Sequence, residues 1–477
     1  MLIRNEAIGE LPRKRIAVVI IGGTVFMRLK GETLEPGEIK LPLLRPQGKP
    51  AWCIDEFRPG NVEIQQHFLY NIDSSRIDVK RLNQLGKKLV QLSNDKTIDG
   101  VVVISGTDRM HKIVTRLAHH LHDLHKPVVF TGAQIELAKQ GTDAKRNYEN
   151  AVRTAWYLSV AKYPNVVLCF GRDRIEQGAD VHHSLNALKL KSSELDAFDH
   201  PHKRVILQAH YDGNVRLTGW GKKLLGSKSL RALYRSKKER HEAPLTTFTP
   251  VREDLLDNIE VSETRSIQGI RISKTAQVIA LRASGKGNVA KNVLETVAKR
   301  AGNRPVIVTT DAGADVDLAA YKPGREALQH GMLPSGGLIP VSAEIRGEYL
   351  GHEMAKIDNY VLRNCPRETD KNDFKRKLFA ALYLSGAKFH GEATKRKHED
   401  ALGIKIPNFD LIINRPIEIA LVRAHKEMLR KPQALPIPNK RKYRIAPQNA
   451  FKTDRLTRQI GKSPLPFKEK SLGVFSH

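Results

Sequence analysis

The thirteen residues from Ile98 to Met110, IDGVVVISGTDRM, decide how the fold of this chain is interpreted. Gly100 opens a run of four apolar β-branched residues, which is typical of a buried parallel strand. Ser105-Gly106-Thr107-Asp108 ends that run, and apolar residues recur at helical spacing from Met110. The stretch therefore predicts a Thr-Asp pair at the carboxyl end of a strand, the edge where open α/β sheets bind ligands. The same pair could instead cap the following helix, because both residue types are good N-caps.

Strand and helix patterns alternate on both sides of this stretch, which indicates a doubly wound, mostly parallel α/β sheet. The expected strands are residues 15–21, 61–70, 101–104, 126–131 and 165–170, with helices at 79–93, 110–121 and 142–158. Three more strand ends carry glycine, hydroxyl or acidic residues: Gly22-Gly23-Thr24, Asp73-Ser74-Ser75 and Gly132-Ala133-Gln134. Since parallel strands end at one edge of a sheet, these four polar ends predict a single shared site.

A second, smaller α/β unit is expected farther along the chain, from strands at 276–281 and 305–310 and a helix at 289–301. We expect domains at 14–215 and 266–395, joined by a basic insertion and linker at 216–265. Residues 396–477 are expected to be a basic, proline-containing extension in which 416–431 could form one amphipathic helix. From Lys426 to Lys470 there are 13 Lys/Arg, 3 Asp/Glu and 6 Pro, a balance that opposes a packed core.

Composition places the chain among soluble globular proteins, with 477 residues, 40% of them hydrophobic and 27% charged. Its net charge of +29 predicts non-specific affinity for polyanions such as RNA. The cysteines, Cys53, Cys169 and Cys365, form no CxxC pair, so neither a disulfide framework nor a zinc site is expected. The chain has no apolar run of signal-peptide or membrane-spanning length, which favours a cytoplasmic location without a membrane span. We expect no cofactor.

Taken together, these motifs resemble the bacterial-type L-asparaginase family, and more closely its cytoplasmic type I branch. Residues 21–24 (IGGT) are similar to the family's TGGT, 73–75 match its DSS, 105–110 (SGTDRM) are similar to HGTDTM, and 131–137 (TGAQIEL) are similar to TGSQIPL. In the second unit Gly287-Asn288 is similar to a family GN turn, and Asp315 lies where type II members place an acid that faces a neighbouring subunit. The resemblance covers roughly residues 14–390 and implies a two-domain asparaginase-like fold.

The resemblance also implies a chemistry. A Thr of the first motif, here Thr24, attacks an amide and forms an acyl-enzyme that water hydrolyses. Thr107 and Asp108 correspond to the pair that works beside a Lys, while Ser74 and Asp108 would hold the substrate's α-carboxylate and α-ammonium groups. Gly23 and its neighbours would offer backbone N–H groups to the oxyanion. The implied substrate-binding residues are Gly23, Asp73, Ser74, Ser75, Asp108, Asn288 and Asp315.

Two helpers of the nucleophile are not matched. The family Lys position falls on His183, whose neutral imidazole could serve as the base. Lys189 or Lys191, in what resembles a short insertion, could reach back instead. The family's lid Tyr falls near Leu34, and no Tyr occurs between Thr24 and Tyr70.

The main hypothesis is an asparaginase-like amidohydrolase that acts on L-asparagine or a related amide, with Asn or Gln preference left open. The alternative is a catalytically degenerate relative that binds RNA or another polyanion through its basic insertion and tail. An archaeal amidotransferase subunit that feeds ammonia to tRNA-bound glutamate is a third possibility. That family carries a small domain before its first motif, which here begins near residue 15. By analogy with the family, a homo-oligomer, a dimer or tetramer, is expected.

Overall fold

The computed structural model of the chain describes the ranges on which the following account rests. They are residues 13–30, 33–36, 62–172, 178–185, 187–199, 205–210, 215–226, 245–252, 256–260, 272–283, 289–310, 316–320, 322–365, 367–389 and 391–429. The predictions for Asn288, Asp315, the basic segment 227–244 and the tail from Lys431 fall outside these ranges.

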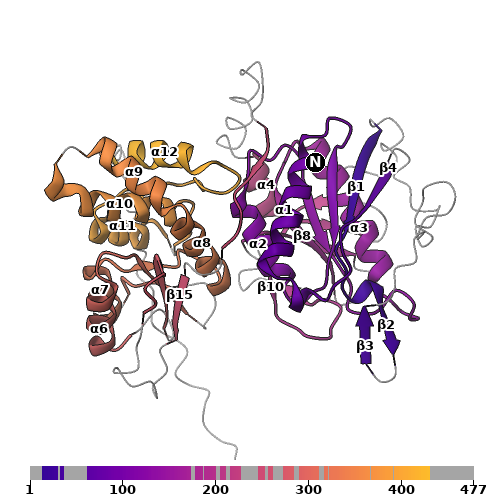
Figure 1. Cartoon of the computed structure of the whole chain (residues 1–477), viewed down its shortest axis with the longest axis horizontal. Coiled ribbons are helices and arrows are strands. Elements are labelled where there is room, and N and C mark those ends of the chain that lie inside the picture. The colour runs from indigo at the N-terminus through magenta and orange to yellow at the C-terminus, as the bar shows by residue number, and fades with distance from the viewer. Residues whose placement is uncertain are drawn as a thin grey trace, which may run out of the picture. The chain divides into compact units, whose positions relative to one another are not determined.

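The first domain is built on an eight-stranded mixed sheet with the strand order β13-β12-β9-β8-β7-β5-β1-β4 (Figure 1). Five strands, from β4 to β8 in that order, run parallel, and the other three are antiparallel to their neighbours. The strands of the sheet are β1 Lys14–Ile20, β4 Val62–Phe68, β5 Gly100–Ile104, β7 Val128–Thr131, β8 Val166–Gly171, β9 Ala179–His183, β12 Val205–Ala209 and β13 Val215–Leu217. The doubly wound, mostly parallel sheet expected from the sequence is confirmed.

In the part of this domain that the structure describes, four helices and three small two-stranded sheets accompany the large sheet. The helices are α1 Val79–Asn94, α2 Met110–His120, α3 Ala144–Val160 and α4 Gly219–Gly226, with 3-10 turns at Thr24–Phe26 and Ser74–Arg76. The small sheets pair β2 Met27–Lys30 with β3 Thr33–Pro36, β6 Leu121–His122 with β14 Thr247–Phe248, and β10 Leu188–Lys189 with β11 Phe198–Asp199. The helices expected at 79–93, 110–121 and 142–158 are therefore present.

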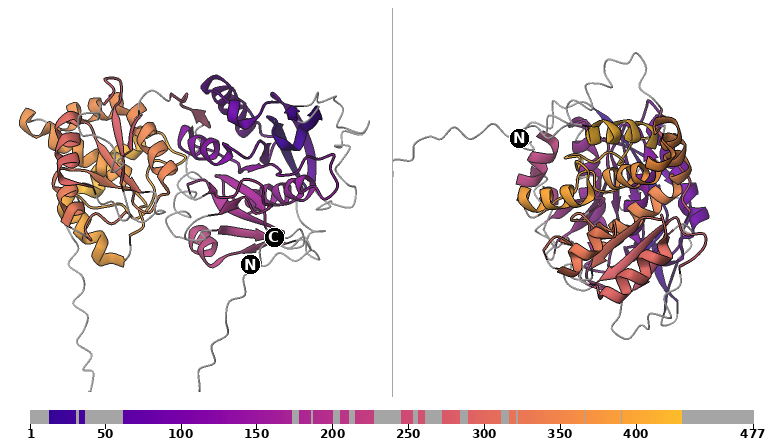
Figure 2. Two further views of the ribbon diagram at one scale, coloured as in Figure 1. Left: turned by 90° about the horizontal axis from the view of Figure 1, so that it is seen from below. Right: turned by 90° about the vertical axis from the view of Figure 1, so that its left-hand side faces the viewer.

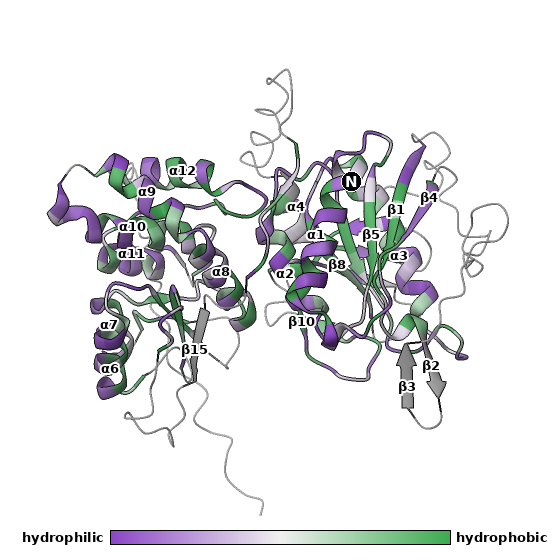
Figure 3. Ribbon diagram, viewed as in Figure 1, coloured by the Kyte–Doolittle hydropathy of each residue, from purple (hydrophilic) through white to green (hydrophobic). Residues whose placement is uncertain are grey.

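Alternating side chains of the central strands separate two hydrophobic cores. On β1, Ala17 and Val19 pack on the face covered by α1 and α2, whereas Ile16 and Val18 pack on the α3 face. Because both faces are covered, the central strands β5, β7 and β8 are mainly apolar, and β8 is mainly green in the hydropathy colouring (Figure 3). The views of Figure 2 show these strands between their helices.

The second domain holds a four-stranded parallel sheet of order β15-β16-β17-β18 with its own core. Its strands are β15 Leu256–Glu260, β16 Val278–Ala283, β17 Val306–Thr310 and β18 Leu333–Pro334. Its helices are α6 Lys291–Ala301, α7 Lys322–Gln329, α8 Pro340–His352, α9 Met354–Asn364, α10 Lys371–Tyr383, α11 Gly391–Leu402 and α12 Ile417–Leu429, with a 3-10 turn at Glu368–Asp370. The second α/β unit predicted from the sequence is thus present.

The expected domain boundaries need correction. β13 and α4 belong to the first domain, so the linker does not start at residue 216. β15 already pairs with β16, so the second domain includes residues before 266. Residues 391–429 are part of the second core rather than an extension, because Leu402, Leu411 and Leu421 are buried in it. The amphipathic helix expected at 416–431 is α12.

No helix within the described ranges is long and apolar enough to cross a membrane.

Candidate active site

The four polar strand ends of the first domain meet at one edge of its sheet. Ile20, the last residue of β1, is in register with Phe68 of β4 on one side and Ile104 of β5 on the other. Ile104 is in turn in register with Thr131 of β7. The loops that follow these strands therefore start at the same level, and they carry the motifs that the sequence singled out.

The Gly22-Gly23 turn fits between two of these loops with no room for side chains. A Cβ on Gly22 would lie 2.4 Å from the backbone N of Ile72, and one on Gly23 would lie 2.3 Å from the backbone N of Gly106. Both glycines also have positive φ, +106° and +98°. The turn delivers Thr24, half-buried, to the start of a 3-10 turn at this edge.

The Asp73-Ser74-Ser75 segment packs against the same loop from the other side. Ser74 is buried, and its Oγ accepts a hydrogen bond from the backbone N of Arg109 at 3.4 Å. Asp73 Oδ1 accepts one from the backbone N of Ser75 at 2.7 Å and so caps the 3-10 turn, while the Ser75 side chain is exposed. Of these three side chains, Asp73 and Ser74 are the ones less exposed to solvent at this edge.

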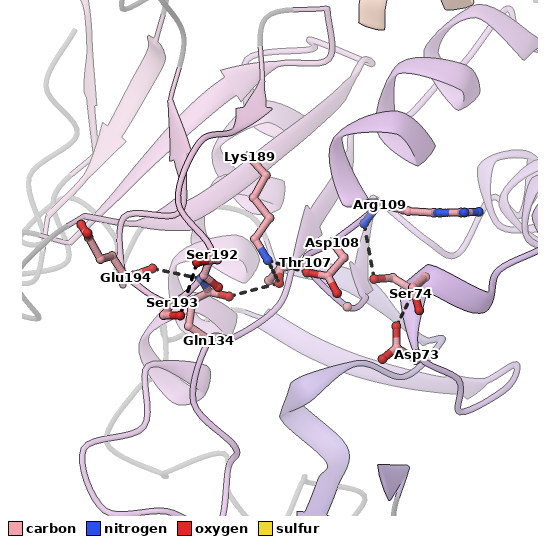
Figure 4. A network of polar contacts seen from close by, with 12 residues as sticks. Asp73, Ser74, Thr107, Asp108, Arg109, Gln134, Lys189, Ser192, Ser193 and Glu194 are labelled. Atoms are coloured by element: carbon pink, nitrogen blue, oxygen red, sulfur yellow. Dashed lines mark hydrogen bonds and ion pairs between the residues drawn. The ribbon is translucent and has the colours of Figure 1, made fainter. Parts of the chain in front are cut away.

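Lys189 is the amine that contacts the Thr-Asp pair. Its Nζ donates to Thr107 Oγ1 at 2.8 Å and lies 2.6 Å from Asp108 Oδ1. Figure 4 shows the Lys189 side chain extending toward Thr107 and Asp108, while the Arg109 side chain points away. Neither Thr107 nor Asp108 caps α2, whose N-cap residue Arg109 makes no side-chain capping bond. The capping interpretation is therefore wrong, and the pair is free to face Lys189.

The Lys189 ammonium is largely buried and lies near two other ionisable side chains, Asp108 and His111. The Lys189 side chain is only 12% exposed, whereas Asp108 is 60% exposed. His111, in the first turn of α2, has a pKa lowered to about 4, mainly by burial and also by the charges of Lys112 and Lys189. A neutral His111 therefore adds no positive charge beside Lys189 near neutral pH.

Thr107 and Lys189 are joined by a hydrogen bond, and the sequence model of a known family covers the loops that hold them. Residues 15–219 match the family described as "Asparaginase, N-terminal". Residues 15–219 therefore form an asparaginase-family domain.

Curated relatives and solved structures agree with this assignment. The L-asparaginase of Thermococcus kodakarensis is 26% identical over 65% of this chain and 88% of its own length. One subunit of the glutamyl-tRNA(Gln) amidotransferase of Thermoplasma acidophilum is 25% identical over 71% of this chain and 75% of its own. The structure of the thermostable L-asparaginase from T. kodakarensis superposes with a TM-score of 0.54 at 20% identity, covering 83% of this chain and 99% of that one. L-asparaginase I from Vibrio cholerae gives 0.54 at 22%, over 71% and 92%. The two-domain asparaginase fold is therefore confirmed.

His183, which the sequence places at the family Lys position, bonds and packs with residues other than Thr107 and Asp108. It is the last residue of β9, opposite Val167 of β8. Its Nδ1 accepts a hydrogen bond from the backbone N of Leu185, and its ring packs edge-to-face with Trp220. Lys189, six residues farther on, contacts Thr107 instead. The geometry therefore favours Lys189 over His183 as the residue that acts beside Thr107.

Lys191, the other lysine considered from the sequence, is used inside the hairpin that carries Lys189. Its Nζ lies 2.7 Å from Asp196 Oδ2 and 2.6 Å from Glu194 Oε2, and these partners raise its pKa. It therefore stabilises the β10–β11 hairpin and does not compete with Lys189 for Thr107.

Sequence reasoning gave no role to Gln134 or Asp143. Gln134 Oε1 accepts a hydrogen bond from Thr107 Oγ1 at 3.1 Å. Asp143 is fully buried, and its carboxylate accepts hydrogen bonds from the backbone N–H groups of Gln134 and Ile135. An Asp before a helix usually indicates an N-cap, yet this one makes no capping bond to α3. The TGAQIEL segment was the signal that could have pointed to Gln134.

Proposed function

We propose that this protein is an asparaginase-like amidohydrolase that hydrolyses a small amide, with L-asparagine as the expected substrate, to the acid and ammonia. The amidohydrolase class is supported by the family match and by the named relatives. The observation that carries the proposal is the contact of Lys189 Nζ with both Thr107 and Asp108. The sequence places the family Lys position on His183 and leaves Lys189 and Lys191 as alternatives, and the contact with Thr107 and Asp108 supports Lys189.

The reaction proceeds in two halves. The Thr24 hydroxyl gives up its proton as Oγ1 forms a bond to the amide carbon, the C–N bond breaks, and the nitrogen gains a proton and leaves as ammonia. Water then gives up a proton as its oxygen bonds to the acyl carbon, the bond to Thr24 Oγ1 breaks, the acid is released, and Thr24 Oγ1 regains a proton. Each half needs a group that gives or takes one proton. In our proposal Lys189, Thr107 and Asp108, which contact one another, perform that transfer.

The substrate's charged groups would bind at the neighbouring loops. Ser74 and Asp108 are proposed to hold the α-carboxylate and α-ammonium groups, with Asp73 and Ser75 supporting the 3-10 turn that places Ser74. Backbone N–H groups at the Gly22-Gly23 turn are proposed to stabilise the oxyanion. A homo-oligomer remains part of the proposal and rests on the family analogy alone.

The direct test is ammonia release from purified full-length protein with L-asparagine and with L-glutamine. Thr24→Ala should reduce release to below a few per cent of wild type with the fold intact, because acyl transfer needs that hydroxyl. Thr24→Ser keeps a hydroxyl and should retain part of the activity, while Thr97→Ala, at an exposed surface Thr, is the matched control. Wild-type protein that hydrolyses neither amide would contradict the proposal and favour a catalytically degenerate, polyanion-binding protein.

A second candidate follows from the amidotransferase relatives. The chain is similar to one subunit of the glutamyl-tRNA(Gln) amidotransferases, over 71% of its length for the protein from T. acidophilum and 72% for that from Pyrococcus furiosus. In this case the released ammonia would be passed to an acceptor rather than to solvent. Ammonia release that appears only when glutamyl-tRNA(Gln) is added would favour this candidate over a free-standing amidohydrolase.

A further inference from the structure

The backbone of Gln134 is held in place by the buried carboxylate of Asp143. It follows β7 at the edge of the sheet where the site lies. Its backbone N donates to both carboxylate oxygens of Asp143 at 3.1 Å, and Asp143 is further held by Asn147 Nδ2 at 2.9 Å. Since Asp143 is fully buried, these charge-assisted bonds are shielded from water. The Gln134 side chain therefore starts from a fixed point.

The side-chain amide of Gln134 uses both of its ends. Its Nε2 donates to the backbone carbonyls of Ser192 and Glu194, at 3.0 and 3.1 Å, while Oε1 accepts from Thr107 Oγ1 (Figure 4). Carbonyl oxygens accept only, so the NH2 group must face Ser192 and Glu194 and the oxygen must face Thr107. Thr107 is then obliged to donate to Gln134, which turns a lone pair of its Oγ1 toward Lys189.

The two carbonyls lie at the tip of the hairpin that carries Lys189. Lys189 is in β10, paired with Phe198 of β11, and the backbone N of Leu190 donates to the Ala197 carbonyl at 2.9 Å. β10 and β11 have only two residues each, so the hairpin has few backbone bonds of its own. Contact of its tip with Gln134 thus ties the hairpin to the loop that bears Thr107.

We propose that Gln134 is a positioning residue of the hydrolytic site: it holds the tip of the 188–199 hairpin and the Thr107 hydroxyl in one arrangement, so that Lys189 meets an acceptor oxygen. This inference rests on the proposed amide hydrolysis for its kinetic consequence. Its structural part, the attachment of the hairpin, stands independently of any activity.

Gln134→Met tests the proposal because methionine has a similar length and makes none of the three hydrogen bonds. Amide hydrogen exchange at Leu190 and Lys191 should become roughly tenfold faster or more, because the tip of the hairpin loses two hydrogen bonds. The kcat for the amide should fall roughly 10- to 100-fold with KM within about twofold, because Lys189 and Thr107 are displaced while the substrate contacts remain. Gln91→Met, at an exposed glutamine that contacts Lys88, should change neither quantity.

A double substitution separates positioning from general structural damage. If Gln134 acts through Lys189, adding Gln134→Met to Lys189→Met should lower kcat by less than about twofold further. Gln134→Glu, which keeps the acceptor but loses both donors, should loosen the hairpin in the same way and serves if the Met variant does not fold.

Two results would overturn the proposal: hairpin exchange unchanged in both Gln134 variants, or a Gln134→Met loss of kcat that is as large without Lys189 as with it. Wild-type protein with no activity on any amide would contradict the proposed function instead. The exchange measurement would then still decide whether Gln134 holds the hairpin.

Discussion

Lys189 is the residue whose position most changes the interpretation of the site. The order of motifs along the chain puts His183 where relatives have a Lys, but residue order cannot show how far a side chain reaches. The short hairpin between Leu188 and Asp199 brings the Lys189 ammonium to Thr107. The Lys191 ammonium instead forms ion pairs with Asp196 and Glu194.

Substitutions at the candidate bases should therefore separate their roles. Lys189→Met should lower kcat roughly 10²- to 10⁴-fold, the usual contribution of a general acid–base group. His183→Gln and Lys191→Met should each stay within about tenfold of wild type, because neither side chain contacts Thr107 or Asp108 in the structure. Steady-state ammonia release from the three purified variants measures this. An inactive His183→Gln variant beside an active Lys189→Met variant would assign the base to His183.

The loops at the sheet edge pack closely against one another because their glycines place no side chain between them. Gly23→Ala should displace Thr24, since the new Cβ would lie 2.3 Å from the backbone N of Gly106 at a φ of +98°. We expect loss of most amide hydrolysis and a free energy of unfolding lower by about 1–3 kcal/mol. Gly141→Ala is the matched control, because Gly141 also has positive φ, +77°, but a Cβ there meets nothing within 4 Å. Ammonia release and urea unfolding of both variants check the expectation, and equal losses in the two would show that crowding at Gly23 is unimportant.

Helix α2 carries histidines that are buried in the neutral form. Burial lowers the pKa of His111 to about 4 and that of His120 to about 3, and it also lowers the pKa of His119. The Nδ1–H of His120 donates to the Thr249 carbonyl at 2.8 Å, which raises the pKa of His120, but burial outweighs this effect. Since the unfolded chain takes up protons at these sites near pH 6.5 and the folded chain does not, stability rises with pH in this range.

The free energy of unfolding should accordingly fall as pH drops below about 6.5. The fall continues to about pH 4 for His111 and about pH 3 for His120, which are the pKa values of these residues in the folded chain. Each of His111 and His120 should cost about 2 kcal/mol between pH 8 and pH 5, from the linkage relation and a pKa of about 6.5 in the unfolded chain. Urea unfolding at several pH values measures the slope. His120→Asn, whose amide can still donate to Thr249, should have a shallower slope, while substitution of the exposed His330 by Gln should not. A wild-type slope of zero below pH 6.5 would contradict this account.

Strands and helices of several residues could be predicted from the sequence, whereas strands of only two residues could not. Residues 101–104 are all apolar and β-branched because β5 is covered on both faces. This strand could therefore be predicted from the sequence. β10 and β11 have two residues each, and no periodicity marks so short a pairing. The Thr24, Ser74 and Thr107 loops were predicted together because parallel strands end at one edge. Gln134 was not given a role, because its function depends on carbonyls almost sixty residues away.

Composition misled at the scale of the whole molecule. Residues 396–429 contain many charged side chains, which indicated an extension, yet one face of α12, together with Leu402 of α11, joins the second core. On α12 the charged Glu418 and Lys426 are exposed. A windowed charge count averages over the two faces, so it could not distinguish a basic surface helix from an unpacked segment. The described fold reaches Leu429, and the basic segment that remains beyond it starts at Lys431.

The last prediction concerns that segment, residues 431–477, which holds eleven Lys/Arg against two Asp/Glu. A protein truncated after Arg430 keeps all of the described helices and strands, so it should unfold at the same temperature as the full chain. Its net charge falls from +29 to +20, because the removed charge is eleven minus two. We expect it to bind single-stranded RNA more weakly than the full chain does. If the tail neutralises about four phosphates, full-length affinity should drop roughly 50-fold between 50 and 200 mM salt, as counterion release requires.

A full-length variant with the tail's Lys and Arg replaced by Gln is the control that keeps chain length and removes only charge. Fluorescence anisotropy with a labelled RNA of mixed sequence at the two salt concentrations measures all three proteins. The Gln variant should match the truncated protein, and RNAs of different sequence should bind alike, since the tail's aromatic residues, Tyr443, Phe451, Phe467 and Phe475, are too far apart to form a stacking platform. Equal affinity of full-length and truncated protein would exclude the tail as the binding element, and affinity that does not change with salt would remove the electrostatic argument.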